Sequence, residues 1–209
     1  MTETNNNNAL TKISTLKEQV RMVGDLLGEV LHEISGETLF EAVEHLRKGY
    51  IQLSRKDNEQ HRAELMQYIE SLDIDLLEQV IRAFNIFYML SNIVEEDFLH
   101  RQRRKLYRTG SKELWKGSFL GAMQDMKNKG LSAEEVQTVL DQMQYIPVFT
   151  AHPTEARRRT TMVLQRSIFL ILDQMQNDYL IEEERESIKR HLKAQIQLLW
   201  RTNNVRVDK

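Results

Sequence analysis

Apolar residues recur at three- and four-residue steps along almost the whole of this 209-residue chain, and this spacing limits its fold more than any other feature. Such steps place side chains on one face of a helix. The first stretch that shows the pattern contains Leu10, Ile13, Leu16, Val20, Val23, Leu27, Leu31 and Ile34. The chain has only eight glycines and two prolines, too few for the frequent turns of a β-sandwich or β-barrel. We therefore predict a mainly α-helical protein.

Helix-start and helix-stop residues divide the pattern into successive helices. Gly36 ends the first helix, and Thr38 with Glu41 has the spacing of a capping box for the second. Asn58 can cap a third helix, and Asp73 precedes a fourth whose broad apolar face predicts a central position.

The second half of the chain predicts further helices after an interruption. Residues 101–108 (RQRRKLYR) carry five cations, and we expect a loop or excursion there. Helices are expected over 111–129, after Ser132 with its capping partner Glu135, and over 154–177 and 180–200.

Charge and cysteine content exclude several classes of protein. The 29 basic and 31 acidic residues leave a net charge of −2, which argues against a protein that coats nucleic acid. The absence of cysteine excludes disulfides and thiolate zinc sites and fits a reducing compartment. Residues 1–9 are polar and asparagine-rich, unlike a signal peptide, and we expect a disordered lead-in there. The longest apolar run, 168–172, is far too short for a membrane span. We predict a cytoplasmic protein without membrane or nucleic-acid partners, folded over residues 10–209.

One segment departs from the helical pattern, and it is the most informative about function. Residues 145–153 (YIPVFTAHP) contain both prolines of the chain, and residues 148–150 favour a short β-strand. His152 follows that strand and precedes a helix start. An imidazole there can act as a general acid or base, and the N–H groups of the helix start attract an anion. The arginines at 157–159 suit a phosphate or carboxylate ligand. A surface histidine beside a solvated basic turn is the alternative.

The remaining polar motifs give weaker signals. The other histidines fit exposed helix positions and lack the spacing of metal ligands; they are His32, His45, His61, His100 and His191. The basic run 101–108 could contact nucleic acid or an acidic partner, but residues 95–97 (EED) would neutralise much of it. Composition alone would favour a helical interaction module without chemistry, and this is the alternative function. The proline-bracketed histidine segment favours an enzyme over such a module.

Residues 148–161 (VFTAHPTEARRRTT) resemble a signature of the phosphoenolpyruvate carboxylase family. Three other segments resemble the family in the same order along the chain: 27–48, 82–100 (RAFNIFYMLSNIVEEDFLH) and 198–206 (LLWRTNNVR). The resemblance runs from about residue 16 to residue 209. It is closer to bacterial members, because the plant-type phosphorylation motif around an N-terminal serine is missing.

This resemblance implies a fold and an activity. The family fold is a helix-rich α/β barrel of TIM type, so residues 10–209 would form its N-terminal helical portion, with the first barrel strand and the catalytic histidine loop at about 146–160. The family carboxylates phosphoenolpyruvate with bicarbonate to oxaloacetate and phosphate, an anaplerotic step feeding the tricarboxylic acid cycle. The resemblance makes His152 the catalytic histidine, which takes a proton from carboxyphosphate.

The resemblance also implies what these residues lack. The family uses Mg²⁺ or Mn²⁺, and its metal carboxylates, phosphate-binding arginines, catalytic lysine and glycine-rich loop lie beyond residue 209. We therefore expect this segment to be inactive alone. Family members are allosterically controlled homotetramers. A chain cut after its first barrel strand exposes apolar faces, so we also expect poor solubility or loose packing.

Overall fold

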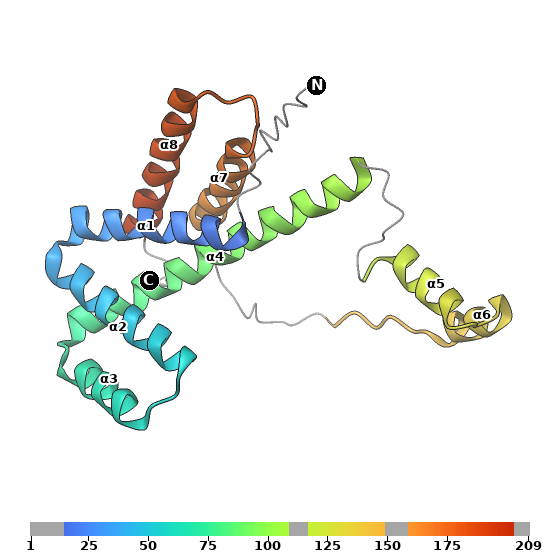
Figure 1. Ribbon diagram of the computed structural model, residues 1–209, viewed down its shortest axis with the longest axis horizontal. Helices are drawn as coiled ribbons and strands as arrows, with labels where there is room; N and C mark the ends of the chain where they lie inside the picture. The colour runs from blue at the N-terminus through green and yellow to red at the C-terminus, as the bar shows by residue number, and fades with distance from the viewer. Residues whose placement is uncertain (1–14, 109–116, 149–158, 203–209) are drawn as a thin grey trace, which may run out of the picture. The chain divides into compact units, whose positions relative to one another are not determined.

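The computed structural model describes residues 15–108, 117–148 and 159–202. Within these ranges the chain contains eight α-helices and no β-strand (Figure 1). The helical prediction is therefore confirmed, whereas the lead-in expected at residues 1–9 lies outside the described residues. The chain forms two compact units, residues 1–97 with 157–209 and residues 98–156, and each is described separately below.

Helices α1 (Leu16–Ser35), α2 (Glu37–Arg55) and α3 (Glu59–Ser71) follow one another through short connections in the first unit. Gly36 separates α1 from α2 with φ 85°, a conformation that glycine adopts without steric cost. Asn58 caps α3 as predicted, because its side chain accepts hydrogen bonds from the N–H groups of Gln60 and His61. The capping box expected at Thr38 is wrong: α2 begins at Glu37, so Thr38 lies inside the helix.

Helix α4 (Ile74–Arg108) is the longest element, with 35 residues. It continues through residues 101–108, so the loop predicted there is wrong. The reason is that arginine, lysine, glutamine and leucine are good helix formers, and cations are favoured at the carboxyl end of a helix by its dipole. The first strong helix breaker after Asp73 is Gly110, beyond the end of α4. Positive charge alone is therefore not a helix-stop signal.

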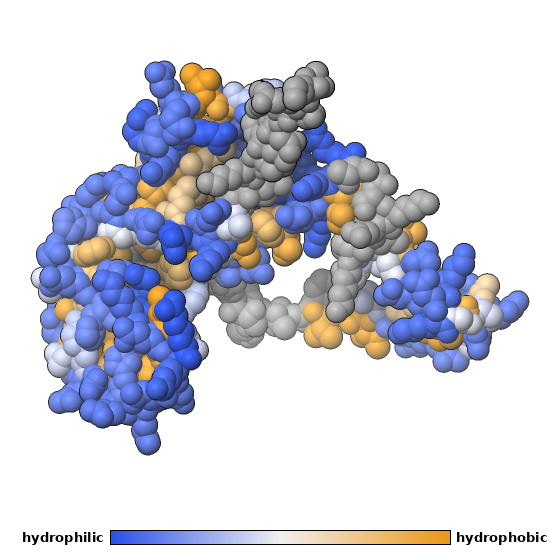
Figure 2. Space-filling view, in the orientation of Figure 1, coloured by the Kyte–Doolittle hydropathy of each residue, from blue (hydrophilic) through white to orange (hydrophobic). Residues whose placement is uncertain are grey.

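Helices α7 (Arg159–Met175) and α8 (Glu182–Arg201) form a hairpin that packs against α1 in the first unit (Figure 1). The core of this unit is continuous. It takes apolar side chains from α1, α2, α3, α4, α7 and α8. The side chains that are wholly inaccessible to solvent include Val23, Val30, Ile86, Leu90, Ile168, Leu192, Ile196 and Leu199. Hydrophilic residues cover most of the visible outer surface (Figure 2), as expected for amphipathic helices.

Trp200 joins three helices of this core. This residue is 5 % exposed, and its Nε1–H donates a hydrogen bond to Ser35 Oγ of α1 at 3.0 Å. The guanidinium carbon of Arg82 on α4 lies 4.9 Å from the centre of the Trp200 ring, within the range of a cation–π contact. Arg82 Nη2 also donates to the carbonyl oxygens of Trp200 and Thr202 at the end of α8. The carboxyl end of α8 is thereby fixed to α1 and α4.

The second unit contains the last part of α4 and the short helices α5 (Phe119–Asn128) and α6 (Ala133–Gln142). The predicted capping box of α6 is confirmed, because Ser132 and Glu135 bond to each other's N–H groups at 3.2 and 2.7 Å. The helix predicted from residue 111 falls partly outside the described residues; its described part begins at Phe119. Neither α5 nor α6 buries a residue.

Candidate functional site

The described residues nearest to His152 on its amino-terminal side are residues 143–148. Helix α6 ends at Gln142, and residues 143–148 have no helical or strand structure. Tyr145, Ile146 and Val148 are 90, 74 and 83 % exposed. Val148 is the one described residue of the predicted strand 148–150, and it has no strand partner in the described parts of the chain. The strand and the barrel remain predictions.

Three site residues proposed from the sequence, His152, Arg157 and Arg158, lie outside the described residues. Arg159 is the first residue of α7, and its side chain is exposed. Two residues later Thr161 is buried. Leu164, Ile168, Ile171 and Leu172 then place α7 in the core at helical spacing. The helix that follows the histidine segment is therefore held firmly from its first turn.

Helix α8, the other helix of the hairpin, also fixes the position of α7. Arg185 donates hydrogen bonds to the carbonyl oxygens of Met175 and Asn177 at 3.1 and 3.2 Å, where α7 ends. Lys193 on α8 contacts Glu29 Oε2 and Glu33 Oε1 of α1, each at 2.7 Å. These two hydrogen bonds raise the pKa of Lys193 above its ordinary value. The hairpin is thus tied to α1 by an ion-pair cluster as well as by the core.

The other five histidines lie on helices, as predicted, and four of them are exposed. His32 Nε2 lies 2.6 Å from Glu37 Oε2, and the His45 ring lies 4.3 Å from that of Tyr68. His61 is the exception, because it is half-buried, with Nδ1 3.3 Å from Glu64 Oε2. No group of three or more His, Cys, Asp or Glu side chains in the described ranges could hold a metal ion.

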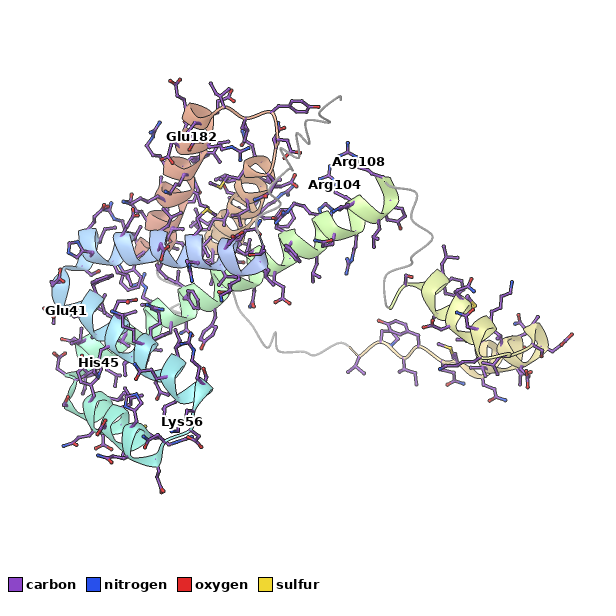
Figure 3. The ribbon with its side chains drawn as sticks, viewed as in Figure 1. Glu41, His45, Lys56, Arg104, Arg108 and Glu182 are labelled. Atoms are coloured by element: carbon purple, nitrogen blue, oxygen red, sulfur yellow. The ribbon has the colours of Figure 1, made fainter. Side chains whose placement is uncertain are left out.

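The basic run ends α4 as a helical segment. Arg104 and Arg108 project from its last turns (Figure 3). The guanidinium carbon of Arg101 lies 5.6 Å from the centre of the Phe98 ring, so this cation is partly engaged with an aromatic face. The basic run continues α4, and Arg101 contacts a side chain of the same helix. This is the usual structure of a solvated helix end.

A feature that the sequence did not reveal is a groove between α1, α2 and α4 in the first unit. Phe84 and Phe87 of α4 line it together with Phe40 of α2. The sequence feature that could have indicated this groove is the unusually broad apolar face of α4, which a single neighbouring helix cannot cover. Three-residue spacing identifies such a face but gives no information about which part of it stays open.

The family model of phosphoenolpyruvate carboxylase matches residues 16–209, nearly the whole chain and including the T-A-H-P-T motif. The chain belongs to the phosphoenolpyruvate carboxylase family. The family identified from the sequence motifs is confirmed.

Several curated phosphoenolpyruvate carboxylases are similar to this chain over nearly its full length. The protein from Ralstonia nicotianae is 32 % identical over 201 residues, which are 96 % of this chain and 20 % of the relative. The protein from Nitrosomonas europaea is 35 % identical over 191 residues, 91 % of this chain and 20 % of the relative. The chain therefore spans about one fifth of the length of these relatives.

None of the described helices combines the length and the apolar character needed to cross a bilayer.

Proposed function

We propose that this chain is the histidine-bearing portion of a phosphoenolpyruvate carboxylase, which converts phosphoenolpyruvate and bicarbonate to oxaloacetate and phosphate. The observation that carries the proposal is the family match over residues 16–209, which includes the motif around His152. The finer assignment to the N-terminal helical portion of a TIM-like barrel, with its first strand at 148–150, is part of the same proposal.

The proposed chemistry has three steps. An oxygen of bicarbonate attacks the phosphorus of phosphoenolpyruvate, and the bond from phosphorus to the enol oxygen breaks, leaving carboxyphosphate and the enolate of pyruvate. His152 then accepts the carboxyl proton of carboxyphosphate, so that the C–O bond to phosphate breaks and carbon dioxide forms. The enolate carbon attacks this carbon dioxide to give oxaloacetate. An imidazole is suited to the proton transfer because its ordinary pKa of about 6.5 leaves it mostly neutral at pH 7.

Exposed apolar surface supports a larger protein around this chain. Tyr145, Ile146 and Val148 are mostly exposed, although a strand buried in a parallel barrel is expected to be apolar on both faces. Helix α7 also has an outward apolar stripe, with Met162 and Val163 at 51 and 59 % exposure. Both surfaces are explained if further strands and helices of the carboxylase cover them.

The divalent metal of the family does not fit the residues that the structure describes, because they gather no metal-binding cluster. We assign the Mg²⁺ or Mn²⁺ ligands to the rest of the carboxylase and derive no step through them. A homotetrameric enzyme in the cytoplasm, with phosphoenolpyruvate and bicarbonate as substrates, completes the proposal. The cysteine-free composition is consistent with that location.

A chimeric enzyme tests the role of His152. Residues 16–209 replace the matching segment of the Nitrosomonas europaea relative, and oxaloacetate is measured by coupling it to malate dehydrogenase. We expect an active chimera in which His152→Asn lowers oxaloacetate formation about 10²- to 10⁴-fold, the usual contribution of a general base. Because the histidine acts after the phosphoryl transfer, phosphate release from phosphoenolpyruvate should persist in this variant.

His191→Asn is the matched control, because His191 is an exposed histidine of α8 whose Nε2 lies 3.3 Å from Gln195 Nε2. It should leave both product rates unchanged. A correctly assembled chimera without activity would contradict the proposed function. Equal loss of oxaloacetate and phosphate in His152→Asn would contradict only the proposed step.

A further inference from the structure

The groove between α1, α2 and α4 is a large open apolar surface within one compact unit. Its volume is about 860 Å³, near the upper end of the range of small-molecule sites. Large side chains reach solvent inside it: Tyr50 is 47 %, Ile51 38 % and Tyr88 62 % exposed. Hydrophobic side chains are visible among hydrophilic ones over α1, α2 and α3 (Figure 2). Contiguous apolar surface of this kind marks an interaction site.

The groove runs along α1, which forms one of its walls. The lining residues of α1 run from Lys17 to Glu33, which at 1.5 Å per residue gives a wall of about 24 Å. Gly24 and Gly28 let aromatic rings approach this wall. Cβ atoms at these glycines would lie 3.2 Å from Phe87 Cε2 and 3.4 Å from Phe40 Cε2, respectively. A wall of this length matches a helix of about four turns.

The charges around the groove are unevenly balanced. At the carboxyl end of α1, Glu29 and Glu33 are paired with Lys193. Across the groove on α2, Arg47 Nε contacts Glu44 Oε1 at 2.6 Å, and this hydrogen bond lowers the pKa of Glu44. At the amino end of α1, Lys17 and Arg21 form no ion pair with the described residues, and Asp25 follows one turn later.

We propose that this groove binds an amphipathic helix from the part of the carboxylase polypeptide outside these 209 residues. The helix places large apolar side chains, spaced three and four residues apart, between α1 and α2, with an acidic side chain beside Lys17 and Arg21. The proposal rests on the proposed function only in taking the chain to be part of a longer carboxylase. About four fifths of the length of the relatives lies outside this segment, so the polypeptide that could fill the groove is abundant.

Other occupants fit less well. A second copy could fill the groove only by inserting a helix of its own, and a symmetric interface would then require that helix and the groove to lie on the same face of each copy. Residues 1–14 contain only Met1, Ala9, Leu10 and Ile13 as apolar residues, too few for four turns of apolar contacts. A compact ligand would leave much of a groove of this length uncovered. A helix from the same enzyme satisfies the length, the apolar lining and the charge together.

Photo-crosslinking in the chimeric full-length enzyme identifies the occupant. Tyr88→p-benzoylphenylalanine places the probe in the groove. Tyr179→p-benzoylphenylalanine is the matched control, because Tyr179 is 93 % exposed and does not line the groove. After irradiation and digestion, we expect the probe at position 88 to join one peptide from beyond residue 209 of the same chain, and the probe at 179 not to join it. Mixing isotope-labelled and unlabelled copies separates contacts within a chain from contacts between chains.

Several results would overturn the proposal. They are a cross-link to a second copy, a cross-link to residues 1–14, and no cross-link from position 88. Crosslinking requires no turnover, so an inactive but assembled chimera can still support the docking proposal, and an active one can refute it. The failure of this proposal is therefore distinguishable from the failure of the proposed function.

A charge substitution provides a second, independent measurement. Ile51→Glu places a carboxylate in the groove, whereas Ile81→Glu places one on an exposed part of α4 that does not line it. We expect Ile51→Glu to lower the melting temperature of the chimera by several degrees and Ile81→Glu to change it little. Equal shifts from the two variants would show that the groove is not covered, against the proposal.

Discussion

The contact between α2 and α3 gives a stability prediction with a definite sign. Gly49 of α2 is buried against Leu65 of α3, which is 2 % exposed. A Cβ atom at Gly49 would lie 2.5 and 2.9 Å from the two methyl carbons of Leu65 and 3.2 Å from its Cγ. All three distances involve one buried side chain. Gly49→Ala therefore requires the whole side chain of Leu65, or the helix that carries it, to move.

The magnitude follows from two opposing terms. Alanine is favoured over glycine inside a helix by about 1 kcal/mol. Overpacking of a core contact costs about 1–3 kcal/mol. Gly28→Ala separates the terms, because Gly28 is also inside a helix but its Cβ would meet Phe40 at an ordinary contact distance of 3.4 Å. Since the helix term is common to both variants, Gly49→Ala should be less stable than Gly28→Ala by about 1–3 kcal/mol.

Urea unfolding of residues 1–209, followed by circular dichroism at 222 nm, measures this difference. With a slope of about 2 kcal/mol per molar urea, the two midpoints should differ by about 0.5–1.5 M. Adding Leu65→Ala to Gly49→Ala should cost less than the sum of the single changes, because it relieves the overlap. Equal midpoints for the two glycine variants would refute the packing of α3 on α2, and would agree with the loose packing expected from the sequence.

Two further predictions concern the attachment of α8. Trp200→Phe removes the hydrogen bond to Ser35 and should lower the free energy of unfolding by about 1–3 kcal/mol, measured by urea unfolding; an unchanged midpoint would contradict this. The folded-state pKa of Lys193 is raised by Glu29 and Glu33, so its stabilising effect is present below the unfolded lysine pKa of about 10.4 and is lost as pH rises through the folded pKa. The melting temperature should therefore fall less steeply above pH 10 in Lys193→Met than in the parent chain, and parallel curves would exclude the contribution.

Local signals were read correctly from the sequence where the structure depends on neighbouring residues. The Asn58 cap and the box formed by Ser132 and Glu135 satisfy N–H groups two or three residues away, so their spacing is sufficient to predict them. Gly36 was recognised as a break for the same reason. Thr38 was misread because a threonine near a helix start can be a cap or a first-turn residue, and spacing does not distinguish them.

Contacts between distant helices could not be predicted in this way. The stacking of Arg82 on Trp200 joins residues 118 positions apart, and no periodicity specifies which apolar faces meet. The sequence shows Ile196, Leu199 and Trp200 at helical spacing, and the structure buries all three. It did not predict that Arg82 would bind the carboxyl end of α8, because an arginine on an amphipathic helix is usually solvated.

The candidate site differs from the helices in what its structure requires. A helix satisfies its backbone hydrogen bonds within its own segment, so amphipathic helices from one stretch of sequence can pack into a core. A barrel strand instead needs neighbouring strands on both sides for its N–H and C=O groups. Val148 has no such neighbour among the described residues, whereas α7, which begins at Arg159, packs one face into the core from Thr161 onward. The fixed position of α7 can therefore be explained from this chain, whereas the proposed strand would need partner strands that the described residues do not supply. The segment that carries His152 was accordingly predicted from its motif, and it lies outside the described residues.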